Sequence, residues 1–247
     1  MNLRVKFSKH GALVYIGHLD VMRYFQKCIR RAEIDVAYTG GFSPHQIMTF
    51  AQPLGVGIES NAEYMDIRVN SMTSTQDVMD ALNQASVPEI RITNVTVLPE
   101  NAGNAMASVF AAKYTMDFRP GKEPEFFLTD GKLDAAKVKE SFDQLMAREV
   151  IPYETETKKG IRELNLMEGI YECSFDPESL TFTMVLNASS GGNIKPSQIM
   201  ESWLKPLGYE LTRTSLRITR EEIYVNEGTE EEVKLVPMDQ VTGDKEK

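Results

Sequence analysis

Residues 3–33, LRVKFSKHGALVYIGHLDVMRYFQKCIRRAE, contain both kinds of secondary structure that decide the fold. Apolar and polar side chains alternate over residues 3–7, the pattern of a β-strand with one buried face. Residues 13–16 are expected to continue this strand or to pair with it. From residue 18 onward, apolar side chains recur at helical spacing: Met22, Phe25, Ile29 and Ala32. We therefore predict an amphipathic helix over residues 18–33.

The chain beyond this stretch alternates between strands and helices. Three strands, one helix and two loops are predicted next: strands at 47–50, 64–69 and 90–98, a helix from Ser74 or Thr75 to about residue 85, and loops at 37–46 and 53–62. With the first strand and helix, this order is β-α-β-β-α-β, that of a ferredoxin-like unit.

A second set of elements with a similar pattern follows residue 110. It comprises strands at 111–118, 172–175, 180–186 and 211–218, strand-like stretches at 150–157 and 161–170, and helices at 134–148 and 196–204. We therefore predict an α+β protein made of two tandem ferredoxin-like units with mostly antiparallel sheets. The predicted divisions are a first unit at 1–98, a linker at 99–110, a second unit at 111–226, and a charged tail at 227–247 that is mobile beyond about residue 236.

The composition is that of a globular protein, with 247 residues, 42% apolar and 26% charged. No apolar run approaches the ~20 residues needed to span a bilayer, and residues 1–6 lack the apolar stretch of a signal peptide. We therefore expect a cytoplasmic protein with no membrane partner. Cys28 and Cys173 are far apart and outside any CxxC pair, which excludes a zinc ribbon or a four-cysteine cluster from this chain alone. We expect two buried thiols.

The charge of the chain is unevenly distributed. The net charge is -9, yet residues 1–50 contain seven basic and three acidic residues and all three histidines. This segment therefore carries +4, and the remainder of the chain carries -13. Overall acidity argues against indiscriminate nucleic-acid binding, and no DNA partner is expected, but a local basic face can contact a phosphate backbone.

The first helix has a basic side opposite its apolar stripe. The side chains on it are Arg23, Lys27, Arg30 and Arg31. They form either a face that contacts phosphates or an acidic partner, or an ordinary solvated helix surface.

Two histidines accompany glycine-containing segments. His18 follows Gly17 at the start of the first helix, where free backbone N–H groups attract anions. It can act as a general acid or base, hydrogen-bond a phosphate, or serve as a structural hydrogen bonder. His45 ends a loop that contains Gly40 and Gly41 and is shaped to hold its side chains in place. Either histidine would be catalytic only if the protein is an enzyme.

We hypothesise that these segments meet at one pocket edged by positive charge. The candidate substrate-binding residues are Arg23, Lys27, Arg30, Arg31, Tyr38, Gly41, Phe42, Ser43, Gly55, Gly57, Ser60 and Glu63. The Gly55-Val56-Gly57 run is not a nucleotide fingerprint, since no strand-to-helix context surrounds it. Histidine and carboxylate ligands for a metal are present, but no metal-site spacing orders them, so no metal and no cofactor are expected in this chain.

Several separated blocks of the sequence resemble the radical-SAM-linked family, a domain of unknown function. The blocks are residues 7–9, 17–23, 29–32, 38–45, 50–51, 54–60, 63–67, 160–163 and 216–220. The sequence departs from the family pattern at three positions: Gly17 stands where the family has Ser, Ser43 where it has Asn, and Gln46 where it has Pro. The resemblance implies a partnership with a radical SAM enzyme, which would carry an iron–sulfur cluster and S-adenosylmethionine. Family members are also often encoded near ribonuclease G and ribosomal proteins.

Three functions remain open on these observations. The first is an accessory, non-catalytic protein that binds RNA, or a ribosome- or tRNA-related substrate, for a separate radical SAM enzyme. The second is a metal-independent endoribonuclease, with His18 or His45 as general base on a ribose 2′-hydroxyl, in a layout similar to the repeat-processing endoribonucleases of CRISPR systems. The third is an adaptor that binds only protein.

Overall fold

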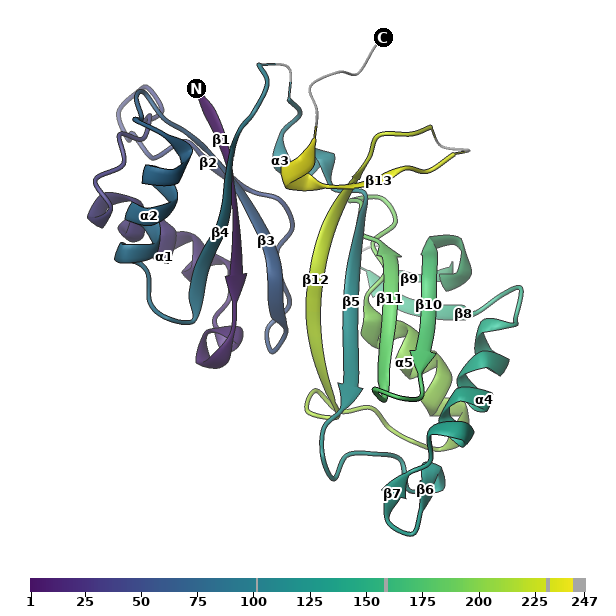
Figure 1. The fold of residues 1–247 in the computed structure, drawn as a ribbon. Helices are drawn as coiled ribbons and strands as arrows, with labels where there is room; N and C mark the ends of the chain where they lie inside the picture. Colours follow the sequence, from purple (N-terminus) through teal and green to yellow (C-terminus); the bar gives the residue numbers. More distant parts are fainter. Residues whose placement is uncertain (101, 158–159, 230–231, 242–247) are drawn as a thin grey trace. The chain divides into compact units, whose positions relative to one another are not determined.

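The computed structural model describes residues 1–247 except 101, 158–159, 230–231 and 242–247 (Figure 1). The chain divides into two compact units. Unit 1 comprises Met1–Ala111 together with Arg220–Lys247, and unit 2 comprises Ala112–Thr219. The boundary between Thr219 and Arg220 falls inside the strand Leu216–Asn226, so the later part of this strand belongs to unit 1. The sequence analysis instead places residues 220–226 in the second unit.

Unit 1 contains most of the residues singled out by the sequence. Its elements are β1 (Asn2–Lys9), the 3-10 turn η1 (Gly11–Tyr15), α1 (His18–Arg31), β2 (Met48–Phe50), β3 (Glu59–Arg68), α2 (Thr75–Ala85), β4 (Ile90–Val97), α3 (Ala105–Ser108), the later part of β12 (Leu216–Asn226), β13 (Leu235–Pro237) and the turn η5 (Met238–Gln240). The strand order is β12-β3-β1-β4, with β2 paired to β3 and β13 paired to β12. β1 pairs antiparallel with both β3 and β4.

Unit 2 follows the same mixed composition. Its elements are β5 (Ala111–Phe118), η2 (Glu125–Phe127), β6 (Leu128–Thr129), β7 (Lys132–Leu133), α4 (Ala135–Met146), β8 (Pro152–Thr157), β9 (Gly160–Asn165), η3 (Leu166–Gly169), β10 (Ile170–Asp176), β11 (Thr181–Asn187), α5 (Pro196–Leu204), η4 (Lys205–Leu207) and the start of β12. β10 and β11 pair antiparallel, as do β8 and β9. The predicted α+β class with mostly antiparallel pairing is therefore confirmed. The tandem ferredoxin-like topology stays a prediction.

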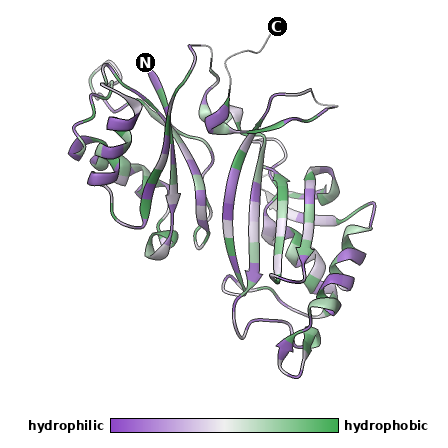
Figure 2. Ribbon diagram, viewed as in Figure 1, coloured by the Kyte–Doolittle hydropathy of each residue, from purple (hydrophilic) through white to green (hydrophobic). Residues whose placement is uncertain are grey.

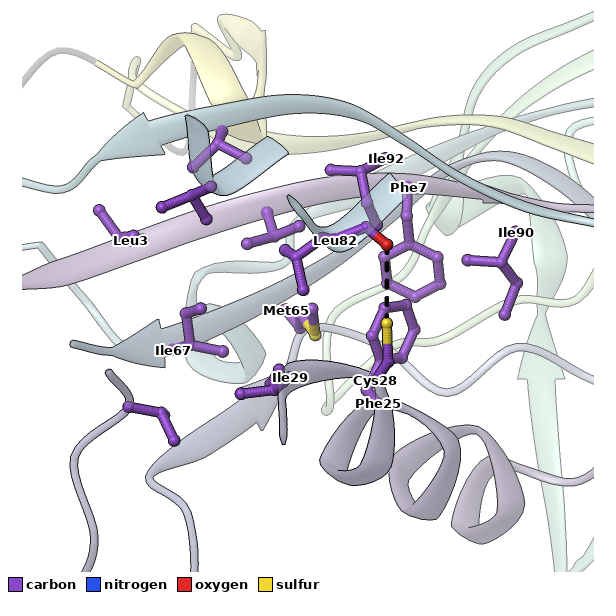
Figure 3. Packing of buried hydrophobic residues seen from close by; sticks show 14 of the residues in the cluster. Leu3, Phe7, Phe25, Cys28, Ile29, Met65, Ile67, Leu82, Ile90 and Ile92 are labelled. Carbon is purple, nitrogen blue, oxygen red and sulfur yellow. Dashed lines mark hydrogen bonds between the residues drawn. The ribbon is translucent and has the colours of Figure 1, made fainter. Parts of the chain in front are cut away.

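The core of unit 1 lies between the sheet and the helices α1 and α2. The Phe7 ring of β1 packs on Phe25 of α1, with ring centroids 4.6 Å apart, and the buried Cys28 thiol donates to the Leu82 carbonyl of α2 at 3.7 Å (Figure 3). Hydrophobic and hydrophilic residues alternate around α1, as Figure 2 shows, because only one side of this helix faces the core. The helix begins and ends close to the predicted bounds.

β3 begins at Glu59, inside the predicted loop 53–62, and α3 lies in the predicted linker. Three further segments differ from the sequence-based predictions. Residues 13–16 do not extend a strand: at Gly11 the backbone turns to φ +61° and begins η1. The last strand begins at Leu216 and not at residue 211, because Ser215 and Thr212 close a hydrogen-bonded turn just before it.

The predicted tail is the third difference. Leu235–Pro237 forms β13, and Met238 is fully buried in unit 1. The Met238 carbonyl accepts a hydrogen bond from the buried Arg4 guanidinium at 3.0 Å. The charged composition concealed these few apolar residues. The end of the predicted tail, residues 242–247, lies outside the described residues, as does residue 101 of the predicted linker.

Of the helices in the described ranges, none combines the length and the apolar character that crossing a bilayer requires.

Candidate functional site

A cluster of buried charged groups joins three strands of unit 1. Arg220 of β12, only 1% exposed, donates from Nε to Glu63 Oε1 of β3 at 2.9 Å. The same guanidinium donates to the Gln52 side chain at 2.8 Å and to its backbone carbonyl at 3.0 Å. Lys9, at the end of β1, is 2% exposed beside this pair. Four residues far apart in sequence therefore form one polar site inside an apolar unit.

Lys9 follows Phe7 on the inward side of β1, and a register shift in the sheet sets which β3 residue lies opposite it. Phe7 pairs with Glu63, but Lys9 pairs with Ser60, so β3 has one extra residue between these two positions. Such a bulge redirects side chains locally. Phe7 and Lys9 line the same cavity. Phe7 is the last apolar residue of β1 that faces the core, and Lys9 is a charged residue at the edge of the core.

The cavity at this cluster has a volume of about 10 Å³. This is the space of roughly one water molecule. Its lining combines polar residues with the edge of the core: Phe7, Lys9, Ile16, His18, Val21, Phe50, Gln52, Leu54 and Glu63. Burial lowers the pKa of the Lys9 ammonium, the Glu63 charge opposes that effect, and the Arg220 charge adds to it. We call this cavity and its lining the Lys9 pocket.

His18 is the candidate histidine that lies at the Lys9 pocket. It is the first residue of α1, and the helix begins there because the Gly17 carbonyl accepts from the N–H groups of Asp20 and Val21 at 3.0 and 3.1 Å. The His18 ring stands at 88° to the Phe50 ring, with centroids 5.3 Å apart. This edge contact fixes the imidazole at the boundary between core and pocket.

Ser60 and Glu63 take different positions around the same cluster. Ser60 is fully buried, and its hydroxyl donates to the Arg220 carbonyl at 3.3 Å and accepts from the Ala62 N–H at 3.2 Å. It therefore supports β12 next to the cluster, and it does not line the cavity. Glu63 lines the cavity and holds Arg220. The structure thus brings His18 and Glu63 together, with Ser60 behind them.

His45 lies on a separate loop. Thr39 and His45 hold each other: Thr39 Oγ1 accepts from the His45 N–H at 3.1 Å and lies 3.1 Å from His45 Nδ1. Between them the chain turns at Gly41, with φ +97°, and exposes Phe42 completely. Ser43 is exposed beside them, and its carbonyl lies 3.4 Å from His45 Nδ1. His45 is not among the residues that line the Lys9 pocket.

The second glycine loop packs on the turn before α1. The Gly57 N–H donates to the Val14 carbonyl at 2.7 Å, and φ of +89° at Gly57 makes this approach possible. A side chain at Gly55 would press on Ile58 at 3.1 Å. This loop also contributes Leu54 to the Lys9 pocket. The two glycines thus allow the backbone of the loop to turn and pack closely, and the neighbouring Leu54 side chain lines the cavity.

The basic side chains of α1 are exposed. Arg23 pairs with Asp20 at 3.2 Å, and Arg30 Nε donates to the Gln26 carbonyl at 3.3 Å. Arg31 is directed to the end of α2, where it donates to the Ala85 carbonyl at 2.9 Å. Lys27 is exposed between these residues. Tyr38 is half exposed and pairs with Gln46 through an isolated bridge at the base of the His45 loop.

A second polar cluster lies on β1 and β3, beneath the C-terminal segment. Lys6 Nζ donates to Glu222 at 2.6 Å, and the Tyr64 hydroxyl lies 2.6 Å from Glu222 and 3.0 Å from Asp239. Burial and the two carboxylates raise the pKa of Tyr64. Burial opposes ionisation of Asp239, but hydrogen bonds from Asn94 and Tyr64 and the Lys6 charge together lower its pKa. Every charge here has a partner, so this cluster fastens the C-terminal segment.

Unit 2 has a larger cavity of its own, of about 560 Å³. It is lined by β9 residues such as Arg162, by Asn187 at the end of β11, and by the glycine pair Gly191 and Gly192. Such a volume suits a small molecule. No candidate residue from the sequence analysis lies there.

In the parts of the chain that the structure describes, no three His, Cys, Asp or Glu side chains gather as a metal ion would require.

The sequence reasoning missed three members of the charged cluster: Lys9, Gln52 and Arg220. One signal was available for Lys9. Residues 3, 5 and 7 face the core, so residue 9 falls on the inward side of the same strand, where a lysine is unusual. Arg220 carries no comparable local signal, because its partner is 157 residues away in the chain.

Unit 1 is therefore an α+β unit that encloses a small charged pocket and exposes a basic helix and an aromatic loop beside it. The profile of one protein family matches residues 2–196, and the chain belongs to that family, which is described as an uncharacterized protein conserved in bacteria (DUF2344). The matched residues include Lys9, His18 and Glu63. No curated protein matches the chain.

Proposed function

We propose that this protein is an accessory protein that binds RNA, or a ribosome- or tRNA-related substrate, through the exposed surface around α1. The single observation that carries the proposal is Phe42, fully exposed at the tip of a loop that Thr39 and His45 hold closed. Aromatic rings held out from a fixed scaffold are the groups on which unpaired bases stack.

The segments just before and after α1 in the sequence carry further exposed aromatic rings. Tyr15 and Tyr38 are 68% and 50% exposed, and with Phe42 these rings are the most exposed aromatic side chains among the described residues. The Gln46 side chain donates to the Gln26 carbonyl at 3.3 Å, which places the Phe42 loop against α1. We call Tyr15, Tyr38, Phe42, Arg23, Lys27 and Arg30 the aromatic–basic face. Stacking and phosphate contacts together are the usual means of binding single-stranded nucleic acid.

The experiment is fluorescence anisotropy of a labelled single-stranded RNA with the full chain at two salt concentrations. We expect Phe42→Ala to weaken binding by about 5- to 150-fold, from a stacking energy of ~1–3 kcal/mol per base. Arg23→Ala with Arg30→Ala should flatten the salt dependence by about one unit of slope per lost phosphate contact. Phe126→Ala in unit 2, another exposed phenylalanine, is the matched control. Salt-independent or absent binding, or equal losses in the control, contradicts the proposal. A DNA strand of the same sequence should bind more weakly.

The partner in this proposal is a radical SAM enzyme, which would supply the iron–sulfur cluster and S-adenosylmethionine. The sequence resemblance is the basis for this partnership. We also propose, as in the sequence analysis, that the protein is cytoplasmic and that its two units are ferredoxin-like. Affinity purification of the full chain, with both protein and RNA identified, tests the partnership. Recovery of the enzyme without RNA favours an adaptor that binds only protein, and recovery of neither contradicts the partnership.

One observation favours a second candidate function, a metal-independent endoribonuclease. His18 and Lys9 line the same cavity, so a general base and a cation for the developing phosphate charge are close together. His45 is held by Thr39 and lies outside that cavity, which makes His18 the better base. Incubation with structured RNA should then give ends with a 2′,3′-cyclic phosphate, and His18→Ala should abolish them. Intact RNA after prolonged incubation rules this candidate out.

A further inference from the structure

The starting point is the Lys9 ammonium. Its side chain is almost completely buried, yet within the described residues it makes no hydrogen bond and no ion pair within 4.0 Å. An ammonium has three N–H donors, and burying them without acceptors costs several kcal/mol per ion. A buried group that destabilises the fold in this way is expected mainly at functional sites. The Lys9 pocket is therefore the place where this ammonium can meet an acceptor from outside the protein.

The charges around the pocket leave a positive excess. Lys9 and Arg220 are cations, and among the described residues Glu63 is the carboxylate whose charge acts on Lys9. That carboxylate already accepts two hydrogen bonds from Arg220. Nearby, Glu59 pairs with His10 at 3.5 Å and Asp20 pairs with Arg23, so neither is committed to Lys9.

The first turn of α1 adds to this potential. His18 and Val21 line the cavity, and the N–H groups of His18 and Leu19 precede the first hydrogen bonds of the helix, which the Asp20 and Val21 N–H groups make to the Gly17 carbonyl. The helix dipole therefore directs its positive end towards the cavity. A helix of 14 residues has a developed dipole. The buried Lys9 and the helix start act on the same small volume.

We infer that the Lys9 pocket is a binding site for a terminal phosphate group, which inserts one oxygen towards Lys9 and leaves its other oxygens at the His18 end of α1. The cavity volume of about 10 Å³ corresponds to one group of roughly the size of a water molecule, which matches one phosphate oxygen. A phosphate monoester has further oxygens for His18 and the helix N–H groups, which a single-atom anion lacks. The same chemistry is offered by a phosphorylated small molecule and by the 5′-phosphate of an RNA.

Binding is coupled to protonation. Burial lowers the pKa of Lys9, and a phosphate oxygen next to the ammonium raises it again. Phosphate binding therefore takes up protons, and affinity falls as the pH rises through the range in which free Lys9 loses its proton. The inference rests on the proposed function only for its RNA arm, since the pocket itself can be tested with inorganic phosphate.

The first experiment titrates inorganic phosphate into the full chain and follows the His18 ring by NMR and the heat of binding by calorimetry. We expect a saturable shift of the His18 resonance with a dissociation constant of about 1 mM or tighter, roughly −4 kcal/mol. Lys9→Met should weaken binding at least tenfold, and Lys9→Arg should weaken it less. Lys139→Met, an exposed lysine on α4, is the matched control and should bind as the wild type does. Thermal unfolding of each variant confirms that it is folded.

The second experiment compares two RNAs of one sequence, one with a 5′-phosphate and one with a 5′-hydroxyl. Tighter binding of the phosphorylated RNA by wild type, lost in Lys9→Met, supports the site and identifies an RNA end as its source. Phosphate binding without this discrimination supports the site and identifies a small phosphorylated ligand. Phosphate binding with no RNA binding at all overturns the proposed function and leaves the site standing. No saturable phosphate shift, or equal shifts in wild type and Lys9→Met, overturns the inference and leaves a water-filled cavity.

Discussion

Arg220 and Glu63 are 157 residues apart in the chain, and the Arg220 guanidinium donates to Glu63 Oε1 from both Nε and Nη2. Both side chains are buried, so the pair is shielded from solvent and from salt. The net contribution of such a pair is small, because desolvation offsets the attraction, but the loss of one partner leaves the other charge buried alone.

The first prediction follows from this asymmetry. Glu63→Gln should lower the free energy of unfolding by about 3–5 kcal/mol, because it leaves the Arg220 charge without a counter-charge. Asp20→Asn is the matched control, since it breaks the exposed pair with Arg23 and should cost no more than about 1 kcal/mol. Urea unfolding followed by fluorescence measures both. Equal effects of the two substitutions contradict the assignment of Arg220 and Glu63 as a buried pair.

The second prediction concerns Lys9 and pH. The pKa of Lys9 in the folded chain lies below its usual 10.5, so between these two values the unfolded chain binds more protons than the folded one. Stability therefore rises with pH across that window, and below the folded pKa the full penalty of the buried charge is present. Lys9→Met should raise the stability at neutral pH by about 1 kcal/mol or more and flatten this rise.

Denaturant titrations of wild type and Lys9→Met at a series of pH values test this sign. Lys139→Met should follow the wild-type curve, because Lys139 is exposed and pairs with Asp143 at 2.8 Å on the surface of α4. If the Lys9→Met variant is less stable than the wild type at neutral pH, the buried Lys9 charge does not destabilise the fold, and the prediction is wrong.

A third prediction concerns Gln46. Its Oε1 is buried without a hydrogen-bond partner among the described residues, while its Nε2 donates to the Gln26 carbonyl. An unsatisfied buried acceptor costs about 1–3 kcal/mol. Gln46→Met keeps the volume and removes that acceptor, so the melting temperature should rise. Gln76→Met, on the exposed side of α2, is the control and should leave the melting temperature within a degree or two of wild type.

The fourth prediction concerns the C-terminal segment. A chain that ends at Lys234 loses the Met238 carbonyl that Arg4 uses and the Asp239 carboxylate that Tyr64 and Asn94 use. We expect unit 1 to lose several kcal/mol of stability, because buried donors are left without acceptors. The control ends at Val241 and keeps all these contacts. Hydrogen exchange of β1 and β3 amides distinguishes the two chains, and equal protection in both contradicts the prediction.

The sequence predicts local elements of this protein better than it predicts their joining. α1 and α5 follow from helical periodicity and from Pro196 at a helix start, features that depend only on neighbouring residues. The place of β12 and β13 in unit 1 depends on pairing between distant segments, for which periodicity has no information.

The candidate site shows the same limit. In the sequence, His18 stands out because it lies at a helix start beside Gly17, and Glu63 because it follows the second glycine loop within a block of the family resemblance. Arg220 does not stand out, since its role exists only once β12 lies beside β3. The glycine-rich surroundings of His45 and His18 predict a shared pocket, but the His45 ring contacts Thr39 on its own loop.

The distance in the chain between Glu63 and Arg220 also sets the order of events during translation. At about 5–20 residues per second, the ribosome adds the intervening 157 residues in about 8–30 s. During that time the nascent first unit holds Glu63 and Lys9 without their arginine, and unit 2 emerges before β12 can dock. The charged pocket is thus among the last parts of the molecule to form, and a chain that stalls before residue 220 lacks it.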